Sequence, residues 1–163
     1  VSSHCGHCTA CIDACPTKAI VAPFELDARL CISYLTIEHH GSIPAALRPA
    51  IGNRIFGCDD CQLVCPWNRF ATPSQAPQHV VRNGLDNAAL TDLFGWTADE
   101  FERRTRGSAI RRIGHVRWLR NIAVALGNAP TTRHVVHALS TRQHHPNELV
   151  REHVTWALAQ HTL

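Results

Sequence analysis

Apolar positions follow different patterns in the two halves of the chain. In the first half, short apolar segments are interrupted by cysteine, proline and glycine. Only FELDARLCISYLTIEHHG (24–41) has a helical pattern, with Asp27 as its N-cap and Gly41 as its stop. In the second half apolar residues recur at helical spacing throughout. Within this half, the segment TADEFERR (97–104) starts with Thr97 and Glu100 at the spacing of a capping box.

Two segments of the second half resemble each other. RWLRNIAVALGN (117–128) and VREHVTWALAQ (150–160) align at an offset of 32 residues, which pairs Asn121 with His153. RHVVHALSTR (133–142) supplies a short amphipathic helix between them. A period of roughly 30 residues with paired helices is typical of a HEAT-like α-solenoid, and we expect His153 to pack between the repeats.

These patterns predict two domains. The segment ATPSQAPQHVVRNG (71–84), with two prolines and several small polar residues, is typical of a linker or a surface strap. The predicted fold class is an α+β ferredoxin-like domain over residues 1–84, linker included. An all-α HEAT-like repeat domain is predicted to follow over residues 85–163.

The composition indicates what kind of protein this is. The 163 residues contain no Met and begin at Val1, so we expect the C-terminal part of a longer protein. No apolar run approaches the roughly 20 residues that a membrane-spanning helix needs, and no signal peptide is present, which favours a cytoplasmic protein. All eight cysteines lie within the first 65 residues. Their close spacing favours a metal site in a reducing compartment over disulfides.

The cysteine spacing predicts two iron–sulfur clusters. CGHCTACIDACP (5–16) has the C-x2-C-x2-C-x3-C-P spacing of cubane clusters, in which three thiolates bind one cluster and the fourth binds another. CDDCQLVCP (58–66) repeats the C-x3-C-P ending but has only three cysteines, and Cys31 is left over as the displaced ligand. Crossed ligation then gives two complete sets: Cys5, Cys8, Cys11 and Cys65, and Cys15, Cys31, Cys58 and Cys61.

Zinc is the alternative, because C-x2-C pairs also build tetrahedral zinc sites. Four tandem cysteines with a terminal proline are rare in zinc modules, so we predict two [4Fe-4S] clusters. Such clusters transfer single electrons, and another cofactor or a partner must receive them. Trp67, which follows Cys65 and Pro66, is expected to shield a cluster from water.

Four blocks of sequence closely resemble the epoxyqueuosine reductase family: CGHCTACIDACPTKAI, LDARLCISYLTIEHHGSIP, GNRIFGCDDCQLVCPWNRF, and RNIAVALGN with VREHVTWAL. The resemblance covers nearly the whole chain. It implies a bacterial oxidoreductase with an N-terminal cobalamin-binding domain, a two-cluster ferredoxin-like domain and a C-terminal HEAT-like domain. In that family, electrons pass through the clusters to cobalamin and reduce epoxyqueuosine to queuosine in tRNA. The family's cluster ligands fall on the same two cysteine sets.

The resemblance also implies which residues contact the cobalamin. We expect these 163 residues to lack the cobalamin-binding domain and its acidic residue that resembles a proton donor, and therefore to be inactive on their own. The ISYL and CDDC blocks correspond to segments that face the cobalamin, which makes Ser33, Tyr34 and Asp59 candidates for contacting it. The alternative is that Ser33 and Tyr34 pack a helix against a cluster and Asp59 is a solvated loop carboxylate.

The charge is segregated along the chain. Residues 1–102 carry 6 basic and 11 acidic side chains, whereas residues 103–163 carry 10 arginines and only two acids. Guanidinium groups suit phosphate oxygens, so a basic helical half fits the anticodon stem-loop of a tRNA. Four arginines beside Trp118 are the candidates: Arg111, Arg112, Arg117 and Arg120. The alternative is an ordinary solvated helix face.

Three other functions remain open at this point. A reductive dehalogenase-like enzyme would use the same cofactors on a small haloorganic substrate, but such a substrate needs no arginine-rich helical tail. A free-standing ferredoxin-type carrier would need no long segment beyond the clusters. The tail on its own fits a protein-binding solenoid. The expected partners are tRNA and an electron donor that the sequence does not identify, and we expect a monomer.

Overall fold

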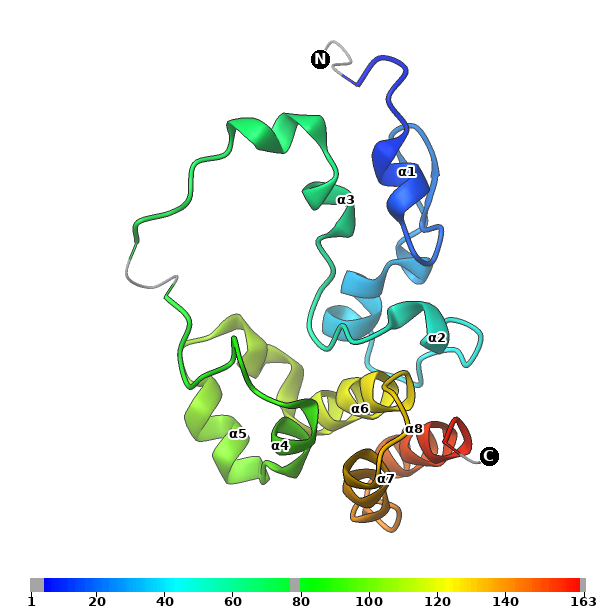
Figure 1. Cartoon of the computed structure of the whole chain (residues 1–163), viewed down its shortest axis with the longest axis vertical. Coiled ribbons are helices and arrows are strands. Elements are labelled where there is room, and N and C mark those ends of the chain that lie inside the picture. The colour runs from blue at the N-terminus through cyan, green and yellow to red at the C-terminus, as the bar shows by residue number, and fades with distance from the viewer. Residues whose placement is uncertain (1–4, 77–79, 162–163) are drawn as a thin grey trace.

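The computed structural model describes residues 5–76 and 80–161. The outer ends of the predicted domains 1–84 and 85–163, and the middle of the predicted linker, lie outside these residues. The described part is mostly helical with one small sheet (Figure 1). None of its helices is long and apolar enough to cross a membrane.

The first half is built from short elements around the cysteines. In chain order they are α1 (Ala10–Ala14), β1 (Ile20–Ala22), β2 (Glu25–Leu26), the 3-10 turn η1 (Ala28–Leu30), the π-helix η2 (Tyr34–Glu38), α2 (Arg48–Ile51), α3 (Asp60–Leu63) and the 3-10 helix η3 (Pro66–Phe70). Strands β1 and β2 form an antiparallel pair in which Ile20 is the partner of Leu26.

The helix predicted over 24–41 is only partly formed. Its first residues belong to β2, because pairing with β1 prevails over the helical pattern. Asp27 is an N-cap, as predicted, but of η1, where its carboxylate accepts a hydrogen bond from the Arg29 backbone N at 3.0 Å. The chain is extended at Cys31 and turns helical again in η2, which ends before Gly41. The interruption leaves Cys31 at the joint between two short helical elements.

The second half is helical, as its periodicity predicted. It contains α4 (Leu90–Gly95), α5 (Ala98–Thr105), the 3-10 helix η5 (Ala109–Ile113), α6 (Gly114–Gly127), α7 (Arg133–Ser140) and α8 (Glu148–Ala159). The predicted capping box is confirmed at the start of α5. There the Thr97 hydroxyl accepts from the Glu100 N, and the Glu100 carboxylate accepts from the Thr97 N. Whether these helices form a HEAT-like repeat stays a prediction.

Helix α6 lies among the helices of the second half, next to α8 and beneath α2 in the view of Figure 1. All residues from Trp118 to Gly127 are buried, as expected for a helix surrounded by protein on every side. Part of its surface joins α4, α5, α7 and α8 in the main core, whose largest members include Phe94, Phe101, Trp118 and Leu139. On another side, Val124 packs against Ile32, Ile43 and Ile51 of the first half. The two predicted domains therefore share a core along α6, and the boundary at residue 84 stays a prediction.

His153 is fully buried, but its ring does more than pack between repeats. Its Nε2 accepts a hydrogen bond from the Ile43 backbone N at 3.2 Å, and its Nδ1 pairs with the Leu149 carbonyl oxygen at 2.7 Å. The first bond joins α8 to the first half of the chain. His153 therefore contributes to the contact between the two halves.

Candidate functional site

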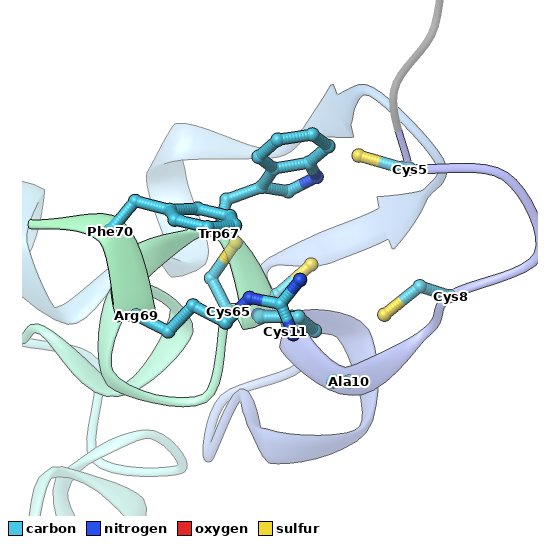
Figure 2. A pocket seen from close by; sticks show the side chains of 9 residues that line it. Cys5, Cys8, Ala10, Cys11, Cys65, Trp67, Arg69 and Phe70 are labelled. Atoms are coloured by element: carbon cyan, nitrogen blue, oxygen red, sulfur yellow. The ribbon is translucent and has the colours of Figure 1, made fainter.

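Four cysteines line a first cavity of about 250 Å³ (Figure 2). They are the first predicted set, Cys5, Cys8, Cys11 and Cys65, accompanied by Trp67, Arg69 and Phe70 among others. Figure 2 shows the Trp67 ring beside the sulfur of Cys5. Trp67 covers this cavity only in part, because 54% of its surface is exposed.

Local structure explains how residues from two distant segments meet there. Gly6 adopts a left-handed conformation (φ +54) in the turn that is closed by a hydrogen bond from the Cys8 N to the Cys5 carbonyl at 3.0 Å. Cys11 follows in α1, which lies against α3. Cys65 stands just before η3, at whose start Pro66 occupies a position where its missing N–H costs nothing.

The second predicted set lines a larger adjoining cavity of about 400 Å³. Its members come from four places: Cys15 at the end of α1, Cys31 after η1, Cys58 in the loop before α3, and Cys61 in α3. This cavity also touches Cys5, Cys8 and Cys11, so the two spaces are neighbours. Apolar residues of the β1–β2 hairpin complete the wall, among them Ile20, Phe24 and Leu26.

The thiols of the second set have distinct electrostatic surroundings. Burial acts to raise the pKa of the Cys15 thiol, but hydrogen bonds from the Ala19 backbone, at 3.2 Å, and from Ile20 and Thr17 lower it below its ordinary value. Burial raises the pKa of Cys58 and of Cys61. The donors around Cys15 would also stabilise a metal-bound thiolate.

The cysteine side chains line two cavities, and their sulfur atoms are not gathered around a single point. A zinc ion would hold each sulfur at about 2.3 Å from one centre. In the described part of the chain, no group of three or more His, Cys, Asp or Glu side chains is arranged to hold one metal ion. Thiols that line cavities of about 250 and 400 Å³ fit a larger, multi-atom group.

The Ser33 hydroxyl forms hydrogen bonds with the protein backbone. It donates to the Cys58 carbonyl oxygen at 3.1 Å and accepts from the Cys58 backbone N at 2.9 Å. The Thr36 hydroxyl, one turn on, accepts from the Gly57 N at 3.0 Å. These bonds favour the structural alternative for Ser33, because they fasten the second cysteine run to η2.

Tyr34 and Asp59, the other two candidates for the cobalamin contact, face solvent. Tyr34 is 37% exposed, and its ring centroid lies 6.0 Å from that of His39. Asp59 is exposed and accepts a hydrogen bond from the Gln62 amide at 3.2 Å. Both side chains remain accessible to a further group, so their assignment stays a prediction.

Arg120, one of the four arginines predicted to contact nucleic acid, does not lie on the solvated face that the sequence suggested. It is fully buried, and its guanidinium donates to three backbone carbonyls, those of Leu35, His39 and Gly41. Burial, and then the charge of Arg117, lower the pKa of Arg120 to about 10. Four arginines close together in the sequence suggested one exposed face, but Arg120 lies on the buried side of α6.

The other three predicted arginines differ in how far their guanidinium groups are taken up by bonds within the protein. Arg117 is half-buried, and its guanidinium donates to the carbonyls of Ile113, Ile37 and Arg112. Arg111 and Arg112 are exposed, but each forms an ion pair, with Glu102 at 2.6 Å and with Glu38 at 2.7 Å respectively. Of the four predicted arginines, these two are exposed, whereas Arg117 is only partly so.

The sequence reasoning missed several residues. Arg103 and Arg106, at the end of α5, are exposed, and neither side chain makes a hydrogen bond or ion pair within residues 5–76 and 80–161. The run RRTR (103–106) was the signal that could have found them. Asn121, Thr36 and Gly57 were not predicted either. Their positions in the sequence give no sign that they form hydrogen bonds with segments that carry cysteines.

Comparison with known proteins gives a consistent result. Residues 4–68 match the 4Fe-4S double cluster binding domain family. The chain is 64% identical over 162 residues to an epoxyqueuosine reductase from Xanthomonas campestris, covering 99% of this chain and 46% of that protein. It is 62% identical over 160 residues to the epoxyqueuosine reductase of Pseudomonas aeruginosa, covering 98% and 44%.

A solved structure is also similar. The crystal structure of epoxyqueuosine reductase with an epoxyqueuosine-modified tRNA-Tyr stem loop superposes with a TM-score of 0.88 at 32% identity, covering 98% of this chain and 42% of that one. The chain thus spans less than half the length of the proteins that it matches. Along nearly all of its residues, the chain is similar at 62–64% identity to a part of the epoxyqueuosine reductases.

Proposed function

We propose that the chain holds two [4Fe-4S] clusters within an epoxyqueuosine reductase. One cluster is bound by Cys5, Cys8, Cys11 and Cys65, and the other by Cys15, Cys31, Cys58 and Cys61. The observation that carries this proposal is the grouping of the thiols around two adjoining cavities. In the first cavity, Cys65 from the second run joins three cysteines of the first run.

The donor set fits the proposed group. Each set supplies four thiols, which is the number that a cubane cluster requires, and no cysteine is left over. The two cavities share Cys5, Cys8 and Cys11 in their walls, so the clusters would be neighbours. Neighbouring clusters suit transfer of single electrons from one to the other.

The reaction proposed for the whole protein is the reduction of epoxyqueuosine in tRNA to queuosine. Two electrons and two protons are consumed, the epoxide oxygen leaves as water, and an alkene remains. The clusters would supply single-electron transfer and cobalamin the strongly reducing centre. Within this chain, Tyr34 and Asp59 remain candidates for the cobalamin contact because both are accessible.

The helical second half is proposed to face the tRNA, as a HEAT-like domain. The relative whose structure includes a modified tRNA stem loop supports this role by similarity. Arg111 and Arg112 present cations on the surface, and Arg103 and Arg106 present further cations that no ion pair within the described residues offsets. Such groups bind phosphates without reading sequence.

The test uses the full-length protein, reconstituted anaerobically with iron, sulfide and cobalamin. It is given reductant and tRNA bearing epoxyqueuosine, and the digested RNA is analysed for queuosine by mass. Formation of queuosine supports the proposal. If the cobalt is reduced but the epoxide survives, the proposed cofactors are right and the proposed substrate is wrong. That outcome would favour a dehalogenase-like enzyme.

A further inference from the structure

Asn121 of α6 is buried, and its side-chain amide uses its full hydrogen-bonding capacity. It is 1% exposed. Its Nδ2 donates to the carbonyl oxygens of Thr36 at 2.8 Å and of Ile55 at 2.9 Å. Its Oδ1 accepts from the Arg120 Nε at 3.0 Å and Nη2 at 2.9 Å. A side chain so fully paired in a core fixes the position of every group that it contacts.

The two carbonyls belong to the segments that carry Cys31 and Cys58. Thr36 lies in η2, five residues after Cys31, and Ile55 precedes Cys58 by three residues. Asn121 therefore joins two segments that are otherwise connected through the hydroxyl bonds of Ser33 and Thr36. Each of these two cysteines stands apart from the tandem run at 5–15, so tertiary contacts must set their positions.

Arg120 reinforces the same side of η2. Its guanidinium donates to one carbonyl within η2, that of Leu35, and to two just beyond it, those of His39 and Gly41. Carbonyl groups left free at the C-terminal end of a helix carry partial negative charge, which favours a cation. Because Asn121 Oδ1 accepts two of the Arg120 N–H groups, the amide and the guanidinium form one buried unit.

We propose that Asn121 is a positioning residue for one of the two clusters, the one assigned to Cys15, Cys31, Cys58 and Cys61. This inference rests on the proposed function. Asn121 fixes the separation of Cys31 and Cys58 and keeps water out from between their segments. The other set lies in the N-terminal loop, α1 and the start of η3, where Asn121 makes no hydrogen bond.

The test measures the reduction potentials of both clusters in the reconstituted full chain, by redox titration followed with electron paramagnetic resonance. Cys31→Ala, which removes a ligand of one set only, identifies which potential belongs to which cluster. In Asn121→Ala we expect one potential to rise, because water admitted to the site stabilises the more negative reduced cluster. We expect a change of about tenfold in the ratio of oxidised to reduced cluster, about 59 mV for one electron.

Two further variants separate positioning from mere stability. Asn121→Asp keeps the volume and an acceptor for Arg120 but removes both N–H donors, so it tests the proposal even if Asn121→Ala fails to fold. Leu139→Ala removes a fully buried side chain of α7 that lines neither cysteine cavity, so it lowers stability without touching the cysteine segments.

The expected result is a shift, or selective loss, of one cluster in both Asn121 variants and no such change in Leu139→Ala. Selective loss would leave about four iron per chain. Unchanged potentials in both Asn121 variants would overturn the positioning role, as would an equal shift in Leu139→Ala. Wild-type protein that binds no iron and sulfide would instead reject the proposed function itself, and this inference with it.

Discussion

Ser33 and Cys58 are joined by two hydrogen bonds, although 25 residues separate them. The Ser33 hydroxyl donates to the Cys58 carbonyl oxygen at 3.1 Å and accepts from the Cys58 N at 2.9 Å. Both polar backbone groups of a cysteine are thus held by one side chain. The second cysteine run therefore depends on η2 for its position, and not only on its own turn.

Replacing Ser33 by Ala is expected to lower the free energy of unfolding by about 1–3 kcal/mol, because the Cys58 N–H and C=O lose their partner in a partly buried place. Chemical denaturation of the reconstituted protein measures the loss. Ser140→Ala is the control, since the Ser140 hydroxyl is exposed and donates to the Val136 carbonyl within its own helix. Weaker cobalamin binding at unchanged stability would instead support the cobalamin contact predicted for Ser33.

Helices α6 and α8 approach so closely at Gly127 that no side chain fits. A Cβ there would lie 2.5 Å from the Trp156 ring and 3.0 Å from the Ala157 Cα. Gly127→Ala is expected to cost about 1–3 kcal/mol through overpacking. At Gly95 nothing lies within 4 Å of an added Cβ, so Gly95→Ala should leave the melting temperature unchanged or raise it slightly. Equal melting temperatures for the two variants would contradict the packing argument.

Stability should fall below neutral pH through His153. Burial, and then the charge of Arg48, lower the pKa of His153 from 6.5 to about 4. The unfolded chain therefore binds a proton between these values that the folded chain does not, so stability is complete above about 6.5 and is lost as pH falls toward 4. The expected loss is about 2–4 kcal/mol.

The measurement is denaturant unfolding at several pH values in wild type and in His153→Gln. The glutamine oxygen can still accept from the Ile43 N, but it does not titrate in this range. The stability of the variant should therefore change less between pH 7 and pH 4.5 than that of the wild type. Equal slopes in the two proteins would show that another group causes the acid sensitivity.

Two pairs of exposed arginines are candidates for binding the RNA: Arg111 and Arg112, predicted from the sequence, and Arg103 and Arg106, found in the structure. Reversing Arg111 and Arg112 to Glu should weaken binding of the tRNA stem-loop and flatten its salt dependence, by about 0.7–0.9 in the log–log slope for each phosphate that is no longer neutralised. Reversal of Arg103 and Arg106 should have at least the same effect, because these cations have no ion pair to break within the described residues.

Arg29→Glu is the matched control, since Arg29 is 86% exposed, pairs with Asp27 and lies in the first half of the chain. Binding is measured by titration at low and high salt. Unchanged affinity in both double variants at every salt concentration would place the RNA elsewhere.

Local patterns predicted much of this molecule. Helical periodicity gave the helices of the second half, and the capping box at Thr97 depends only on residues three apart. The cysteine sets were also proposed from spacing alone. Burial of Arg120 and Asn121 was not foreseen, because a charged residue in a basic run suggests a solvated face. The backbone carbonyls that these two side chains bind belong to η2, to the residues just after it and to the segment before Cys58, and only the tertiary fold brings them to α6.

The interruption at Cys31 was missed for a related reason. The pattern over 24–41 is helical, but the pairing of β2 with β1 takes up its first residues. A single sequence does not reveal which of two local preferences the rest of the fold supports. Cys31 could still be assigned by counting thiols, because that argument needs no geometry.

The assignment of Cys31 is directly testable by metal content. If Cys31 completes the second set, Cys31→Ala should lose one cluster and retain about four iron and four sulfide, against about eight of each in wild type. Cys65→Ala should give the same count but leave the other cluster, so the remaining paramagnetic signals of the two variants should differ and together account for the wild-type spectrum. Retention of eight iron in Cys31→Ala, or identical spectra in the two variants, would reject the crossed sets. A protein that binds zinc without sulfide would reject iron–sulfur clusters altogether.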